Sequence, residues 1–224
     1  MKPIKKMPKI SNEKKMENIK RPKVSICIPI HWMKNWQFFL TRCLSSIEQQ
    51  TFTDYEIIIT KKGRMAENTN AGISKATGDI IKILYMDDYL AHPDSLKNIA
   101  ENFKGGWLAT GCVHDWGDRK FKGPHLPKVE GITSNIISNT IGSPSVIAFE
   151  NKDPLMFDEN MTWVLDLDYY LRLLRRYGPP TILDSYDTAI GCGEHQVTNI
   201  LSQEAKELED KYLIEKWKTQ KSQF

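Results

Sequence analysis

Two adjacent carboxylates at the end of a buried strand are the residues best suited to do chemistry in this chain. The stretch from Gly78 to Asp88 has apolar side chains at positions 80, 81, 83 and 84, and Asp87-Asp88 follow where the strand emerges. Ligands of open α/β sheets bind at the carboxyl ends of strands. Neighbouring carboxylates repel each other unless a proton or cation compensates, and such an oxygen-rich site suits Mg²⁺ or Mn²⁺ and a phosphate-bearing substrate. The alternative is a solvated turn, with Asp94 capping the next helix.

Alternating strand and helix patterns surround this stretch. Strands are expected at 24–30, 55–60, 107–113 and 145–149, with short candidates at 181–183 and 188–190. Helices are expected at 36–50, 65–76, 94–103, 165–177 and 199–218, and residues 105–142 are largely irregular. This alternation favours parallel βαβ units. The sequence therefore predicts an α/β fold, with a mostly parallel central sheet flanked by helices.

Composition favours one globular domain with tails. The chain has 224 residues, of which 40% are hydrophobic and 26% are charged. No apolar run approaches the roughly 18–20 residues that span a bilayer, and the basic N-terminus lacks the apolar core of a secretory signal. The cysteines are scattered without a CxxC pair, which predicts free thiols in a reducing cytosol rather than disulfides or a zinc site. They are Cys27, Cys43, Cys112 and Cys192.

Three regions are expected along the chain. Residues 1–22 form a basic, flexible leader, 23–198 the folded domain, and 199–224 an amphipathic helix and tail. The leader is either a solubilising segment or a contact with anionic lipid, and no interleaved aromatic residues suggest nucleic-acid binding. We therefore expect a cytoplasmic protein, with a solubilising leader favoured and peripheral contact with a membrane surface as the alternative.

The order of the motifs resembles the GT-A fold glycosyltransferases of family 2. The resemblance runs from about Val24 to Thr198, and its strength lies in the order and spacing of short segments. These are Val24–Pro29, Tyr55–Ile59, Asn70-Ala71-Gly72-Ile73 with Ala76-Thr77-Gly78, Leu84–Asp88, Phe157-Asp158-Glu159, and Asp166-Leu167-Asp168 with Leu171-Arg172-Leu173. Members of this family move a sugar from a nucleotide-diphosphate donor to an acceptor with inversion, usually with Mg²⁺ or Mn²⁺. The resemblance implies a Rossmann-like GT-A domain and a glycan or lipid-linked acceptor.

The resemblance also implies roles for individual residues. Asp87 falls on the metal-binding Asp of the family's Asp-x-Asp motif, and His195 falls in a late region from which some GT-A enzymes place a His on the metal or the diphosphate. Asp166 falls on the catalytic base, which deprotonates the acceptor hydroxyl. The structural alternatives are a first-turn helix acid for Asp166 and an exposed His for His195. The expected donor-binding residues are Pro29, Arg64, Asn70, Tyr85 and Asp88; the expected acceptor residues are Trp116, Trp163 and Asp168, the last also being the second candidate for the base.

Three positions depart from the family pattern. Tyr85 replaces the Asp that typically touches the donor ribose, and Thr69 replaces the Arg of Ala-Arg-Asn. Lys61-Lys62-Gly63 replaces Asp-Asp-Gly, and a Lys side chain cannot accept a hydrogen bond from a uracil ring. The nucleotide base is therefore open, with a UDP-sugar as the default donor.

Two other functions stay open at this point. A degenerate, non-catalytic sugar- or partner-binding module is one, because the three departures weaken the donor motifs. A related nucleotidyltransferase is the other, although it predicts a Gly-rich phosphate loop after the first strand. Residues 30–34 occupy that place and contain no Gly.

Overall fold

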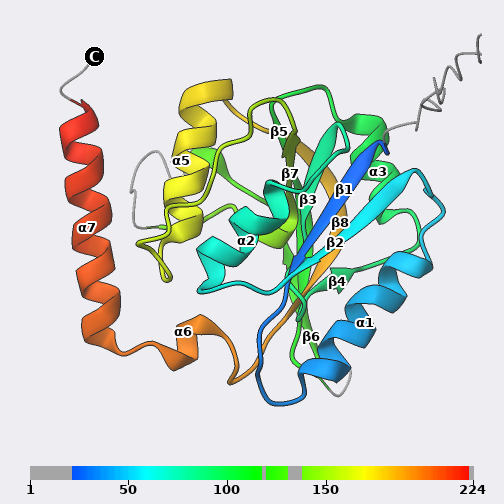
Figure 1. Cartoon of the computed structure of the whole chain (residues 1–224), viewed down its shortest axis with the longest axis horizontal. Helices are drawn as coiled ribbons and strands as arrows, with labels where there is room; N and C mark the ends of the chain where they lie inside the picture. Colours follow the sequence, from blue (N-terminus) through cyan, green and yellow to red (C-terminus); the bar gives the residue numbers. More distant parts are fainter. Residues whose placement is uncertain (1–21, 118–119, 131–137, 222–224) are drawn as a thin grey trace, which may run out of the picture.

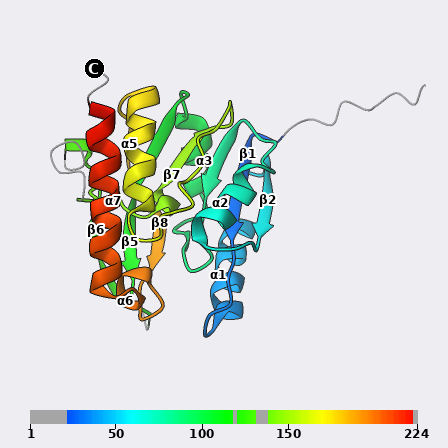
Figure 2. The ribbon, with the colours of Figure 1, turned by 60° about the vertical axis from the view of Figure 1, so that its left-hand side comes forward.

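A central β-sheet with helices on both faces organises the chain (Figures 1 and 2). This computed structural model describes residues 22–117, 120–130 and 138–221, so most of the predicted leader lies outside the described residues. The strands are β1 (Val24–Pro29), β2 (Tyr55–Thr60), β3 (Ile80–Ile83), β4 (Tyr89–Leu90), β5 (Trp107–Asp115), β6 (Phe121–His125), β7 (Ile147–Glu150) and β8 (Thr181–Gly191). The helices are α1 (Trp36–Glu48), α2 (Met65–Ile73), α3 (Ser95–Asn102), α5 (Leu165–Tyr177), α6 (Val197–Ile200) and α7 (Gln203–Lys221), with a 3₁₀ turn η1 (Pro144–Val146) before β7.

The sheet is mixed, and its longest ladders are parallel, as expected. Its order is β2-β1-β3-β7-β5-β8-β4, with β6 paired to β5. The pairs β1–β2, β1–β3 and β5–β8 are parallel, whereas the shorter pairs β3–β7, β5–β7, β4–β8 and β5–β6 are antiparallel. Helices make the crossovers in the β2-β1-β3 part. Strand β7 enters from the long segment after β6 and lies antiparallel between β3 and β5.

Two cores, one on each face of the sheet, explain the hydrophobic patterns of the strands. All six residues of β1 and all four of β3 are buried, as expected for strands covered on both faces. On one face, α1 and α3 contribute Cys43, Ile47 and Ile99. On the other, α2, α5 and α7 contribute a second cluster that includes Ala66, Leu173 and Leu213.

The C-terminal third differs from its sequence prediction in two ways. The two short strand candidates at 181–183 and 188–190 belong to one strand, β8, whose pairing with β5 shifts in register near Gly111. The predicted helix at 199–218 is two helices, α6 and α7. Helix α7 lies alongside α5 (Figure 2); Lys216 of α7 forms ion pairs with Asp168 of α5 and with Asp158 in the segment before α5.

Several local expectations are confirmed. Helix α5 and strand β2 have the predicted bounds, Trp107 is buried and Trp116 is exposed. The four cysteines are free, and Cys192 is the only one of them that is not buried. Within the described part of the chain, no helix combines the length and the apolar character needed to cross a bilayer.

Candidate active site

A cavity of about 850 Å³ opens at the carboxyl ends of the central strands. Its walls come from the ends of β1 and β8, the turn after β3, the start of α2 and the start of α5. Asp87 and Asp166 both line it, although 79 positions separate them in the sequence (166 − 87). The other predicted site residues in its lining are Pro29, Arg64, Tyr85, Asp88, Trp163 and His195.

The Asp87-Asp88 turn is held rigidly behind this cavity. The backbone N–H of Asp88 donates to the Tyr85 carbonyl at 2.9 Å, which closes the turn after β3. The Asp88 carboxylate is only 2% exposed and accepts hydrogen bonds from the Gly191 N–H at 2.8 Å and the Ser143 hydroxyl at 3.3 Å. Burial, followed by the charge of Asp87, raises the pKa of Asp88. Asp88 therefore ties the turn to β8, while Asp87 faces the cavity.

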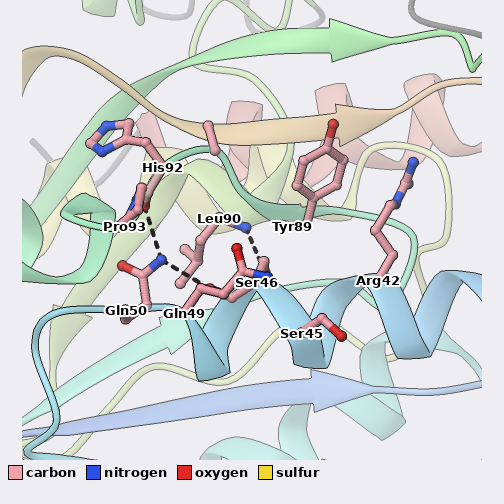
Figure 3. A pocket seen from close by; sticks show the side chains of 10 residues that line it. Arg42, Ser45, Ser46, Gln49, Gln50, Tyr89, Leu90, His92 and Pro93 are labelled. Carbon is pink, nitrogen blue, oxygen red and sulfur yellow. Dashed lines mark hydrogen bonds between the residues drawn. The ribbon is translucent and has the colours of Figure 1, made fainter.

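Arg42 supports the same turn from the side of α1. Its guanidinium donates to the Asp87 carbonyl at 2.5 Å and to the Asp115 carboxylate at 2.7 Å. It also lies 4.4 Å from the centroid of the Tyr89 ring. Figure 3 shows Arg42 and Tyr89 at one end of a smaller cavity of about 280 Å³ between α1 and β4. Sequence reasoning missed Arg42, because nothing in a helical Arg signals which turn it contacts.

His195 and Asp87 form the best match to a metal site. His195 Nε2 lies 3.1 Å from Asp87 Oδ2, and this proximity raises the pKa of His195. The approach angle is poor, so the buried Nε2 atom makes no aligned hydrogen bond. One imidazole and one carboxylate suit Mn²⁺, and Mg²⁺ would rely more on oxygen ligands. No group of three His, Cys, Asp or Glu side chains converges on a metal position among the described residues. The pair therefore fits a metal whose remaining ligands are phosphate and water.

Asp166 lies in the first turn of α5 and lines the same cavity as Asp87. Its carboxylate accepts hydrogen bonds from the Asn139 side-chain amide at 2.6 Å and from the Leu167 N–H at 2.7 Å. Burial raises the pKa of Asp166 to about 6, against the lowering effect of these hydrogen bonds. A carboxylate with a pKa near 6 suits a general base that works near neutral pH. Asn139 had no sequence signal, since it comes from an irregular segment far from Asp166 in the chain.

The predicted donor residues are only partly brought together. Arg64 lines the cavity and donates from Nη2 to the Glu159 carbonyl at 2.7 Å. Tyr85 also lines it, and its buried hydroxyl makes no aligned hydrogen bond within the described structure. Asn70 lies outside the lining, because its side chain bonds the backbone of Phe157 and the carboxylate of Glu159. Asn70 therefore holds the segment around Phe157 and Glu159 against α2 and does not face the cavity.

Of the three predicted acceptor residues, the structure places Trp163 in the cavity and the other two outside its lining. Asp168 is fully buried and binds Arg172 and Lys216, each at 2.8 Å, so it joins α5 to α7. Trp116 is exposed at the end of β5, where Lys122 Nζ lies 4.6 Å from its ring centroid.

Lys82 is a buried cation beneath the site. It is fully buried in β3 and donates a hydrogen bond to the Ser145 carbonyl. Burial lowers its pKa to about 8, while the charges of Asp187 and Asp88 oppose that shift. Its sequence signal was a lysine inside an otherwise apolar strand. Lys82 compensates the buried carboxylates on both sides of it.

Comparisons with known proteins identify the fold. No family model matches the chain, and no curated protein matches its sequence. The structure of S. aureus TarS 1-349 in complex with UDP-GlcNAc matches with a TM-score of 0.63 and 15% identity, covering 80% of this chain and 61% of that one. The mannosyltransferase PcManGT from Pyrobaculum calidifontis, in complex with GDP-Man and Mn²⁺, matches with a TM-score of 0.55 and 12% identity, covering 79% and 59%. The chain thus spans about three fifths of the length of these structures, and it has the GT-A fold of nucleotide-sugar glycosyltransferases.

Proposed function

We propose that this chain is an inverting, metal-assisted glycosyltransferase of the family 2 type. It moves a sugar from a nucleotide-diphosphate donor to a hydroxyl of a glycan or lipid-linked acceptor. One observation carries the proposal: Asp87 at the end of a sheet strand and Asp166 at the start of α5 line one cavity of about 850 Å³. That volume lies in the usual range for small-molecule sites, about 300–1,000 Å³.

The two carboxylates take different tasks in this reaction. Asp166 accepts the proton of the acceptor hydroxyl as its oxygen attacks the anomeric carbon, and the bond to the donor phosphate oxygen breaks with its electron pair. The hydrogen bond from Asn139 fixes the direction of the Asp166 carboxylate. Asp87 and His195 would hold Mn²⁺ or Mg²⁺, which supplies positive charge to the departing diphosphate.

The donor is a nucleotide-sugar whose base the chain leaves open. TarS binds UDP-GlcNAc and PcManGT binds GDP-Man, so both kinds of base occur on this fold. Pro29, Arg64 and Tyr85 line the part of the cavity that we assign to the donor. UDP-sugars are the first donors to test.

The test measures nucleotide release and donor binding separately. Purified protein receives UDP-GlcNAc, UDP-glucose or GDP-mannose with Mn²⁺, with and without a mixture of soluble oligosaccharide acceptors. We expect Asp166→Asn to keep its donor-induced thermal shift while transfer falls by about 10²–10⁴-fold. Asp87→Asn loses the Mn²⁺-dependent part of the thermal shift as well. Asp153→Asn is the matched control, because that carboxylate is 92% exposed and its ion pair is with Arg176, outside the cavity lining.

The outcomes separate the competing functions. Full transfer by Asp166→Asn would remove Asp166 from the role of base. A wild-type protein that binds a nucleotide-sugar with Mn²⁺, but neither hydrolyses nor transfers it, is the degenerate binding module. Release of pyrophosphate instead of a nucleoside diphosphate would indicate a nucleotidyltransferase.

A further inference from the structure

Four large aromatic side chains are exposed at one end of the molecule. Trp32 and Phe38 are each 61% exposed, Phe121 is 56% exposed and Trp116 is 44% exposed. They come from two segments: the loop after β1 with the first turn of α1, and the adjoining ends of β5 and β6. Both segments lie at the lower end of the molecule in Figures 1 and 2. These four residues are called the aromatic rim below.

Contacts through Arg42 and Asp115 show that the two segments of the aromatic rim are neighbours. The Arg42 guanidinium lies 5.7 Å from the centroid of the Phe38 ring and 2.7 Å from the Asp115 carboxylate. Asp115 in turn precedes Trp116 and pairs with Phe121 across the β5–β6 ladder. Arg42 and Asp115 therefore connect the α1 part of the aromatic rim to its β5–β6 part.

The aromatic rim adjoins the mouth of the active-site cavity. His31, next to Trp32, and His114, near the end of β5, both line that cavity. The Phe39 ring, next to Phe38, lies 4.8 Å from the ring of His195. A surface resting on the aromatic rim would thus lie close to the place where an acceptor enters.

Lysines are interleaved with the aromatic rings. Lys61 Nζ lies 3.6 Å from the centroid of the Trp32 ring, and Lys122 Nζ lies 4.6 Å from that of Trp116. The side chains of Lys34 and Lys120 are exposed in the same two segments, Lys61 and Lys62 are exposed in the loop after β2, and Glu194 is an exposed carboxylate after β8. Amphipathic aromatic rings favour the headgroup level of a bilayer, and lysines are attracted to its anionic lipids.

We infer that the aromatic rim docks on the surface of an anionic lipid bilayer. An apolar groove would indicate a protein partner, but here single exposed rings alternate with lysines on separate loops. Peripheral membrane proteins commonly combine two weak contributions to binding, insertion of apolar side chains and attraction of basic side chains to anionic lipid, and the aromatic rim offers both. The start of β1 lies at the opposite end of the sheet from the aromatic rim (Figure 1), and the rim shares no residue with the basic leader, so the two can be mutated separately. The idea that docking delivers a lipid-linked acceptor to the cavity rests on the proposed function. The docking of the aromatic rim on a bilayer is independent of that function.

The test is co-sedimentation of the full-length chain with vesicles of phosphatidylcholine, alone or mixed three to one with phosphatidylglycerol. We expect binding to the anionic vesicles alone, with about tenfold weaker partitioning for Trp32→Ala/Phe121→Ala. Lys34→Gln/Lys120→Gln should weaken partitioning by about fivefold for each lysine removed at low salt. Leu208→Ala is the matched control, because this side chain is 60% exposed on α7, away from the aromatic rim, and should partition like the wild type.

Two results would overturn the inference. One is wild-type partitioning by both rim variants while a leader variant, Lys5→Gln/Lys6→Gln/Lys9→Gln, loses binding. The other is no binding of the wild type to anionic vesicles. Nucleotide release with a soluble acceptor is measured in parallel and should not change in Trp32→Ala/Phe121→Ala. Intact vesicle binding without any transfer would contradict the proposed function and leave the docking standing.

Discussion

Replacing Asp166 by Asn should stabilise the folded protein at neutral pH, although it removes the proposed base. Burial raises the pKa of Asp166 from its usual 3.8 to about 6. In the unfolded chain this carboxyl ionises near 3.9. Between these two values the unfolded state binds fewer protons than the folded state, so stability falls as the pH rises from about 4 to about 6. Above that window the destabilisation is complete, and an uncharged side chain avoids it.

The expected size of this effect follows from the shift and the contacts. A rise from 3.8 to about 6 corresponds to about 3 kcal/mol at about 1.4 kcal/mol per pH unit. Asp166 is only half-buried at the cavity wall, so solvent screening reduces this to about 2 kcal/mol. An Asn keeps one acceptor oxygen and loses one of the two hydrogen bonds, from Asn139 and Leu167, at a cost of about 1 kcal/mol. The net gain is about 1 kcal/mol at pH 7.5, or about 2–4 °C in Tm for a chain of this length.

The assay is urea unfolding at pH 4.5, 6 and 7.5 for the wild type and the variant. The gain should be present at pH 7.5 and should disappear or reverse at pH 4.5, where the wild-type carboxyl is protonated in the folded state. Asp153→Asn serves as the control and should show no such pH dependence, because its carboxylate is almost fully exposed. If Asp166→Asn changes the free energy of unfolding by the same amount at all three pH values, burial does not raise the pKa of Asp166.

Three further predictions concern the same site. Transfer should fall about tenfold per pH unit below about 6, because Asp166 must be ionised to accept a proton; a pH profile of kcat/KM that stays flat down to pH 5 would contradict this. Gly191→Ala should lower the free energy of unfolding by about 1–3 kcal/mol and weaken Mn²⁺-dependent donor binding, because an added Cβ would overlap the Asp87 carbonyl oxygen. Both effects are measured by thermal-shift titration, and Gly123→Ala is the control, because a Cβ added there would meet no atom within 4 Å. Lys82→Met should lower the free energy of unfolding, measured in urea, by about 3–5 kcal/mol, because it leaves buried carboxylates without their cation. An unchanged stability would show that these carboxyl groups are protonated in the folded protein.

The sequence was sufficient where local pattern decides the structure. Helix α5 has the predicted bounds because its apolar side chains recur at helical spacing, and the strand before Asp87 is read from its apolar run. Placing Asp87 and Asp166 in one cavity needed the family resemblance, since no local pattern connects positions so far apart. The antiparallel position of β7 was not predicted, because it is set by pairing with β3 and β5, which the sequence around residues 147–150 does not reveal.

The same contrast applies to the side chains of the site. Asp87 was singled out by its place at the end of a buried strand and His195 by the family resemblance, and both line the cavity. Arg42 and Asn139 were not found, because an Arg on a helix and an Asn in a loop acquire their meaning only from the carbonyl or carboxylate that they bond. One of these contacts fixes the turn that carries Asp87, and the other fixes the carboxylate of Asp166. Hydrogen bonds from outside each motif therefore hold both carboxyl-bearing segments, and motif matching alone cannot show whether a chain with these carboxylates can also position them.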